Sequence, residues 1–130
     1  MIVVDSSVWI SHFANVLHFE VTSLRAIHKT ETILIGDLIV LEVLRGARSE
    51  RDASYIESEL SLFDSAVMLN PDIASKAARN YRSLRAKGIT IRNTVDLIVG
   101  TYCIEHRHRL LHRDRDFAHM EQLGLETYTG

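Results

Sequence analysis

The chain has 130 residues, of which 46% are hydrophobic and 25% are charged, and its formal net charge is −2. This balance fits one globular domain spanning residues 1–130 and excludes a uniformly basic nucleic-acid binder, although local basic surfaces are compatible with it. No apolar run approaches the roughly 18 residues of a membrane span. The single cysteine, Cys103, cannot form an intramolecular disulfide, which fits a reducing compartment, so we expect a cytoplasmic protein.

Short apolar runs alternate with segments of helical periodicity along the first half of the chain. Strands are predicted at 1–4 and 33–35, because both runs are continuously apolar, as in strands buried on both faces. Four helices are predicted after these strands: from a cap at Asp5 or Ser6 through Phe13, and over 20–29, 37–46 and 49–63. The third of these helices is apolar almost all round, which predicts that it is buried.

The second half of the chain continues the alternation of strands and helices. Strands are predicted at 66–69, 109–112 and 125–128, the last at an edge of the sheet. Helices are predicted from Asn70-Pro71 to 87, from 93 or 94 to 106, and over 114–122. The pattern predicts an α/β fold with an open, mainly parallel sheet of four to five strands and helices on both faces. In such sheets, ligands bind beyond the carboxyl ends of the strands.

Acidic residues interrupt otherwise apolar segments at four places. Asp5 follows the first strand, Glu42 lies inside an apolar helix, and Asp96 lies near the start of another; Asp114, with Asp116 beside it, follows the fourth strand. A carboxylate without a partner is costly in an apolar setting, so this placement predicts convergence around a cation. Hard divalent cations such as Mg²⁺ and Mn²⁺ prefer carboxylate oxygens and are the leading candidates.

Each acid also has a simpler interpretation when it is taken alone. Asp5 could cap the following helix, Glu42 could pair with Arg45 three residues on, and Asp96 could be a first-turn acid favoured by the helix dipole. The pair at 114 and 116 could be solvated turn residues. Two carboxylates about 4 Å apart repel by roughly 4 kcal/mol at an effective dielectric near 20, so a cluster needs a cation or protonation of some members.

Four segments, in this order, resemble the PIN-domain ribonucleases and, within them, the VapC-type toxins of toxin–antitoxin pairs. The segments are 3–10, 42–46, 94–99 and 110–117, and the resemblance spans nearly the whole chain. It implies a PIN-like fold and metal-site acids at Asp5, Glu42, Asp96 and Asp114. Asp116 is a further candidate ligand, and the sequence leaves open how it shares that role with Asp114.

The resemblance also assigns roles to side chains around the acids. Ser6 matches the small hydroxyl residue that follows the first aspartate and is expected to orient a metal-bound water. Many relatives carry Ser or Thr where this chain has His112. Arg45, Arg113 and Arg115 lie near the acids in the sequence and are candidates for contacts with RNA phosphates, with ordinary surface solubility as the alternative.

The implied function is divalent-metal-dependent hydrolysis of RNA phosphodiester bonds, with Mg²⁺ or Mn²⁺ as cofactor and a 5′-phosphate on one product. The implied partners are RNA, a VapB-type antitoxin whose C-terminal segment covers the active site, and a second copy of the chain in a homodimer. A non-catalytic PIN-like interaction module is the rival interpretation. A Walker-type nucleotide hydrolase is disfavoured because the chain lacks its glycine-rich loop.

Overall fold

The computed structural model describes residues 1–27 and 31–129. These residues form five strands: Ile2–Val4 (β1), Ile33–Gly36 (β2), Asp64–Ala66 (β3), Arg109–Leu111 (β4) and Glu126–Thr127 (β5). The described helices are Ser6–Phe13 (α1), Phe19–Ile27 (α2), Asp37–Leu44 (α3), Glu50–Leu60 (α4), Pro71–Arg85 (α5), Thr94–His106 (α6) and Arg115–Met120 (α7), followed by a 3₁₀ turn at Glu121–Leu123. None of these helices is long and apolar enough to cross a membrane.

All neighbouring strands of the sheet are parallel, in the order β3-β2-β1-β4-β5. The three residues of β1 are fully buried, because this central strand is covered on both faces, as its continuously apolar sequence predicted. The chain first builds the sheet outward from β1 through β2 to β3, and then returns to the other side of β1 as β4. The strand order therefore switches between β1 and β4, which is where ligands bind in open α/β sheets.

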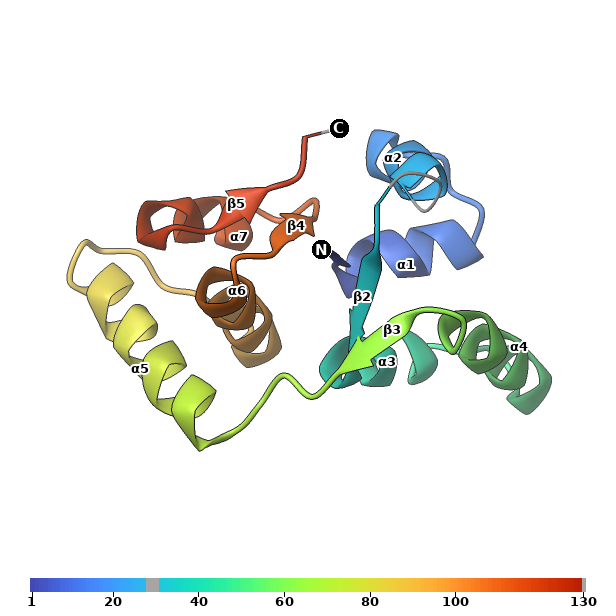
Figure 1. Ribbon diagram of the computed structural model, residues 1–130, viewed down its shortest axis with the longest axis horizontal. Helices are drawn as coiled ribbons and strands as arrows, with labels where there is room; N and C mark the ends of the chain where they lie inside the picture. The colour runs from blue at the N-terminus through green and yellow to red at the C-terminus, as the bar shows by residue number, and fades with distance from the viewer. Residues whose placement is uncertain (28–30, 130) are drawn as a thin grey trace.

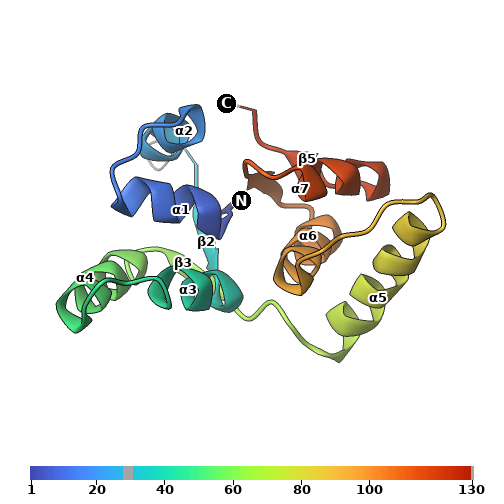
Figure 2. The ribbon, with the colours of Figure 1, turned by 180° about the vertical axis from the view of Figure 1, so that it is seen from behind.

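The helices divide between the two halves of the sheet. Helices α1 to α4 gather around the β2 and β3 half, whereas α5, α6 and α7 gather at the β4 and β5 half (Figures 1 and 2). The first group is joined by packing of α1 against both α2 and α3, and the second by packing of α6 between α5 and α7. The predicted open parallel sheet with flanking helices is thus confirmed, and α1 begins directly after β1, at this switch point.

The close packing of α6 and α7 depends on Gly100. A Cβ atom at this position would lie 2.5 Å from Sδ of Met120, which is fully buried in α7. The absence of a side chain at Gly100 therefore lets α7 lie directly on α6. This contact helps to fix the position of Asp114 and Asp116 at the start of α7 relative to Asp96 in α6.

The prediction of a strand at 66–69 was wrong. Strand β3 covers Asp64–Ala66, and Val67 is 69% exposed. The reason lies in Asp37, the first residue of α3, whose Oδ1 accepts the backbone N–H of Met68 at 3.0 Å. At that point the chain bonds to a side chain instead of continuing the ladder with β2. The prediction that α3 is buried on all sides was also wrong, because the side chain of Leu41 is 58% exposed.

The other differences concern element ends. The helix predicted at 20–29 begins at Phe19, and its last two predicted residues lie outside the described part of the chain. The helix predicted at 49–63 covers Glu50–Leu60, with Ser49 as its cap, and the helix from Asn70 ends at Arg85. The helix predicted at 114–122 becomes α7 with a separate 3₁₀ turn after it.

Candidate metal centre

Three carboxylates from three helices converge beside β1. Asp5, Glu42 and Asp96 are 4%, 7% and 7% exposed, and each offers an oxygen that lies within 4.8 Å of those of the other two. They come from the cap of α1, the middle of α3 and the first turn of α6. Their burial together creates a strongly negative site at the switch point of the sheet.

Asp5 uses its two carboxylate oxygens differently. Oδ2 accepts hydrogen bonds from the backbone N–H of Ser7 at 3.2 Å and from the Ser7 hydroxyl at 2.6 Å, and so caps α1. Oδ1 is buried and has no hydrogen-bond partner among the described residues. Burial raises the pKa of Asp5 above its ordinary value, against the lowering effect of the Ser7 bonds. The cap and the ligand interpretations are therefore compatible, because one oxygen serves the helix and the other is left for a cation.

Glu42 is held by residues on two sides. The Ser6 hydroxyl donates to its Oε1 at 2.9 Å, a buried bond that joins α1 to α3. The guanidinium of Arg45 lies 3.9 Å from Oε2, but the Arg45 side chain is 69% exposed, so this pair contributes little stability. The hydroxyl of Ser6, predicted to orient a water, is thus already engaged in orienting Glu42.

Asp96 is placed by the cap of α6. Oδ1 of Asn93 accepts the backbone N–H groups of Val95 at 2.9 Å and of Asp96 at 3.4 Å, which fixes the first turn of the helix. Burial first, and then the neighbouring charges of Asp5 and the other site acids, raise the pKa of Asp96 to about 7. A pKa this high means that the protein alone does little to stabilise the negative charge of the Asp96 carboxylate, and a bound cation would stabilise it.

Asp114 and Asp116 stand beside this cluster and are not part of the close trio. Asp114 caps α7 through Oδ1, which accepts the backbone N–H of Asp116 at 2.8 Å. Oδ2 of Asp116 accepts the backbone N–H of Arg92 at 3.2 Å and so ties the loop 86–93 to α7. Both aspartates line a cavity of about 620 Å³ that Asp96 also lines, and their charges contribute to the raised pKa of Asp96.

His112 forms hydrogen bonds through both of its ring nitrogens. Its Nδ1 accepts the backbone N–H of Asp114 at 3.2 Å, so Nε2 carries the proton and donates to Oγ1 of Thr127 at 3.0 Å. Thr127 in turn donates to Glu121 at 2.7 Å. Burial is the largest influence on His112 and lowers its pKa, which favours this neutral form. The side chain therefore links β4 to β5 and fixes the backbone of Asp114.

The three arginines predicted to contact phosphate lie in different surroundings. Arg113 pairs with Glu20 of α2 at 3.0 Å, and Arg45 with Glu42 as described. Arg115 is exposed and lines the cavity of about 620 Å³. Arg92 lines the same cavity and was not predicted from the sequence, where its only signal is its place just before the Asn93 cap.

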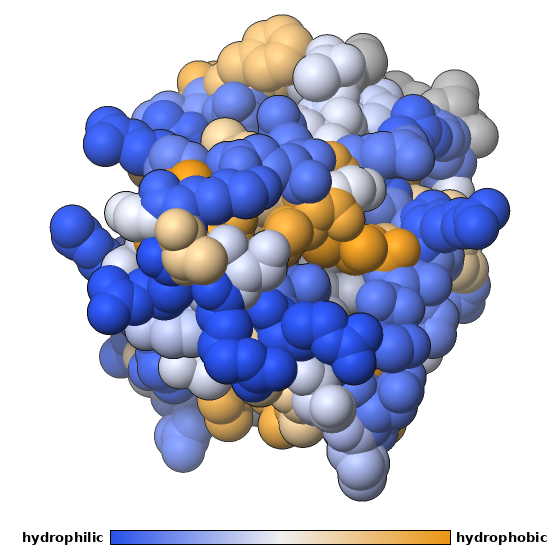
Figure 3. Space-filling view, turned by 90° about the vertical axis from the view of Figure 1, so that its left-hand side faces the viewer, coloured by the Kyte–Doolittle hydropathy of each residue, from blue (hydrophilic) through white to orange (hydrophobic). Residues whose placement is uncertain are grey.

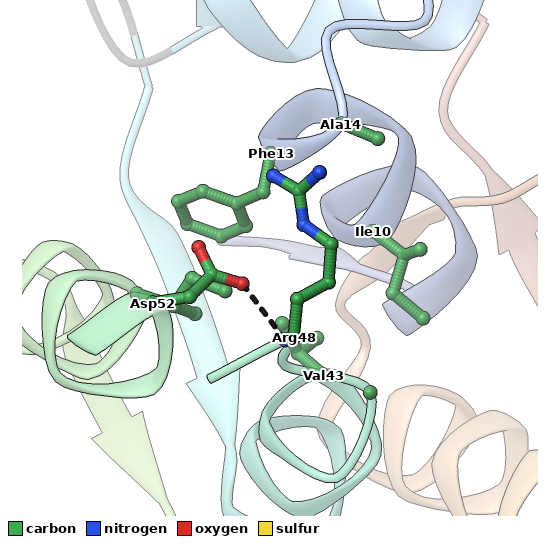
Figure 4. Close-up of a pocket in the computed structure, with 8 residues that line it drawn as sticks. Ile10, Phe13, Ala14, Val43, Arg48 and Asp52 are labelled. Atoms are coloured by element: carbon green, nitrogen blue, oxygen red, sulfur yellow. Dashed lines mark hydrogen bonds between the residues drawn. The ribbon is translucent and has the colours of Figure 1, made fainter. Parts of the chain in front are cut away.

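A second cavity, of about 200 Å³, lies between α1, α3 and α4. Figure 4 shows Ile10, Phe13 and Ala14 on one wall, opposite Val43, and Arg48 and Asp52 at the rim. The backbone N–H of Arg48 donates to Asp52 at 3.1 Å, which joins the loop after α3 to α4. Beside it, Trp9 of α1 is buried, stacks on Phe13 at 6.1 Å, and has an Nε1 without a hydrogen-bond partner in the described residues.

Comparison with known proteins gives consistent results. The PIN domain model matches residues 2–123. Two mycobacterial proteins, VapC ribonuclease Mb1587 of Mycobacterium bovis and ribonuclease VapC11 of Mycobacterium tuberculosis, are each 30% identical over 122 residues, which cover 90% of this chain and 89% of theirs.

Solved structures share the fold at lower sequence identity. The crystal structure of VapBC2 from Rickettsia felis, bound to a DNA fragment from its promoter, has a TM-score of 0.78 at 17% identity and covers 98% of both chains. A toxin–antitoxin complex from Klebsiella pneumoniae has a TM-score of 0.70 at 21% identity and covers 91% of both chains. On the family match and the mycobacterial relatives, the chain is a PIN domain protein of the VapC family.

Proposed function

We propose that this protein is a metal-dependent ribonuclease that hydrolyses RNA phosphodiester bonds and acts in the cytoplasm as the toxin of a toxin–antitoxin pair. The observation that carries the proposal is the convergence of Asp5, Glu42 and Asp96 in a buried site where Oδ1 of Asp5 has no hydrogen-bond partner in the described part of the chain. The names of the mycobacterial relatives support ribonuclease activity.

Asp5, Glu42 and Asp96 would hold Mg²⁺ or Mn²⁺, with Asp114 and Asp116 contributing from the adjacent cavity. The donor set fits such an ion, because it consists of carboxylate oxygens, which hard cations prefer. When bound, the ion supplies a water of lowered pKa and stabilises negative charge on the phosphate. The residues around it keep the carboxylates in place: Ser7 holds Asp5, Ser6 holds Glu42 and the Asn93 cap fixes Asp96.

The rival interpretation, a non-catalytic interaction module, explains the acid cluster poorly. Buried carboxylates that repel one another and raise the pKa of Asp96 to about 7 reduce the stability of the ion-free protein. A module that only binds a protein partner gains nothing from retaining them. Calorimetry with Mg²⁺ and Mn²⁺ on the ion-free protein separates the two interpretations, since the ribonuclease requires binding that depends on Asp5 and Asp96.

Cleavage itself is tested with purified protein, single-stranded and hairpin RNAs, and Mg²⁺ or Mn²⁺, followed by sequencing of the RNA ends. We expect products with 5′-phosphates, loss of cleavage in Asp96→Asn and loss of cleavage in EDTA. Glu105→Gln is the matched control, because Glu105 lies on the same helix and pairs with Lys76 away from the acids. Full activity of purified Asp96→Asn contradicts the proposal.

A partner is proposed for the cavity shown in Figure 4. The cavity is lined mainly by apolar side chains, and one of them, Ile10, is 46% exposed. Because the Klebsiella structure is a toxin–antitoxin complex, we propose that an antitoxin segment docks on α1 and α3 here, next to Glu42. The proposed homodimer is a separate point, which light scattering of the purified chain tests.

A further inference from the structure

We propose that the cavity between the loop 86–93 and α7 is a subsite for one nucleotide of the substrate strand, and that Arg92 and Arg115 hold its phosphate. The proposal rests on the ribonuclease function proposed above and specifies where the strand lies. It makes Arg92 a substrate-binding residue and favours Arg115 over Arg113 and Arg45 among the predicted phosphate contacts.

The cavity adjoins the acids and is large enough for a nucleotide. Its volume of about 620 Å³ falls within the range of small-molecule sites. Three of its lining residues are Asp96, Asp114 and Asp116, so a ligand in it lies beside the metal centre. The other lining residues combine cations, hydrogen-bonding groups and one apolar side chain: Gly88, Ile89, Thr90, Arg92, Asn93, Arg115 and His119.

The backbone of Arg92 is fixed, although its side chain is exposed. Its N–H donates to Oδ2 of Asp116 at 3.2 Å, its neighbour Ile91 is buried at 4% exposure, and Asn93 caps α6. The backbone on both sides of Arg92, and at Arg92 itself, is therefore held in place by packing or by hydrogen bonds. An arginine on a fixed backbone loses less conformational freedom when it binds phosphate than one on a free loop.

The arginines around the acids differ in whether their charge is already neutralised. Arg45 and Arg113 pair with Glu42 and Glu20, whereas Arg92 and Arg115 form no ion pair with any acid among the residues the structure describes. The cations available to an incoming anion are therefore on the α7 side of the metal centre. Guanidinium groups bind phosphate with two parallel hydrogen bonds, which suits this role.

The other lining groups suit a ribose and a base. The Thr90 hydroxyl accepts from Arg85 at 3.3 Å, which leaves its own hydrogen to donate, and Asn93 caps through its oxygen, which leaves its amide N–H₂ to donate. Ile89 supplies an apolar wall. The surface on this side of the molecule, where α5 and α7 lie, is mostly hydrophilic around a central apolar patch (Figure 3).

The test compares Arg92→Gln and Arg115→Gln with Arg79→Gln, a matched change at an exposed arginine of α5 outside the cavity. Binding of a fluorescein-labelled single-stranded RNA is measured by anisotropy in EDTA, where no cleavage occurs, over a range of salt concentrations. We expect Arg92→Gln and Arg115→Gln to weaken binding on the order of fivefold and to reduce the salt slope by about one each. Arg79→Gln is expected to bind as the wild type does.

A second measurement locates the nucleotide directly. Titration of isotope-labelled protein with a nucleoside 5′-monophosphate in EDTA should shift the amide signals of the loop 86–93 and α7 in the NMR spectrum, and Arg92→Gln should weaken this response. The subsite is overturned if the arginine variants bind RNA as Arg79→Gln does, or if the shifts fall elsewhere. If cleavage requires Asp96 but RNA binding is unchanged in Arg92→Gln and Arg115→Gln, only the subsite is rejected. If Arg92→Gln weakens RNA binding but the wild type cleaves no RNA, only the ribonuclease function is rejected.

Discussion

Ser6 donates its hydroxyl hydrogen to Oε1 of Glu42 at 2.9 Å and thereby joins two residues that are 36 positions apart in the sequence. Both residues are buried, and Ser6 directly follows Asp5. The same turn of chain therefore provides one acid of the cluster and the donor that orients another. A ligand held in this way is already in place before an ion arrives.

Loss of the Ser6 hydroxyl is expected to weaken metal binding. Partners that orient metal ligands typically contribute about 10- to 100-fold in metal affinity or activity, and we expect Ser6→Ala to fall in this range. Calorimetric titration with Mn²⁺ measures the affinity. Ser11→Ala, a change on the same helix outside the acid cluster, serves as the control. Equal Mn²⁺ affinity of the two variants rules out this role for Ser6.

The helix-capping role and the charge of Asp5 can be separated by substitution. Asparagine caps helices about as well as aspartate, so Asp5→Asn keeps the cap but loses the charge, whereas Asp5→Ala loses both. In EDTA we expect Asp5→Ala to be about 1 kcal/mol less stable than Asp5→Asn, because alanine provides no acceptor for Ser7. Urea unfolding measures the difference, and both variants should lack cleavage. Equal stability of the two variants would show that the cap contributes nothing.

The pKa of Asp96 predicts how stability depends on pH without metal. This pKa is raised from 3.8 to about 7, so between these values the folded chain holds a proton that the unfolded chain has released. The contribution of Asp96 to stability is therefore present at low pH and is lost as the pH rises towards 7. Added Mg²⁺ displaces this proton, so we expect it to raise the Tm more at about pH 8 than at about pH 6.

Thermal unfolding in EDTA and in Mg²⁺ across this range measures both effects. Asp96→Asn carries no titrating group at this position, so the difference between the variant and the wild type isolates the Asp96 contribution. An increase of Tm on Mg²⁺ addition that is the same at both pH values would contradict the expectation.

The His112 bridge predicts a structural and not a catalytic effect. Thr127→Val removes the acceptor of the Nε2–H and the donor to Glu121, and should cost about 1–3 kcal/mol, because partly buried polar groups lose their partners. Cleavage per folded molecule should change little, since Thr127 is neither one of the clustered acids nor a lining residue of the cavity beside them. Thermal unfolding and cleavage rates are measured together, and a large loss of rate at unchanged stability would place the bridge in the reaction.

The sequence allowed the parallel sheet and the convergence of three of the four predicted acids, Asp5, Glu42 and Asp96, to be predicted from apolar runs and the acids that interrupt them. Strand β1 is continuously apolar, which predicts a buried strand. Asp5 directly follows it and therefore lies at the edge of the sheet where the carboxyl ends of the strands meet. The end of β3 could not be predicted, since it depends on a hydrogen bond from Met68 to Asp37, 31 residues away. The same holds for the position of Arg92, which depends on Asp116 in another segment, and for the pairing of Arg113 with Glu20.

Trp9 gives the protein a built-in optical reporter. It is the only tryptophan in the chain, it is buried, and it stacks on Phe13, which lines the cavity of Figure 4. The intrinsic fluorescence of the protein therefore arises chiefly from a single indole on α1, the helix capped by Asp5. Events at both ends of this helix can consequently be followed in one spectrum without attaching a dye.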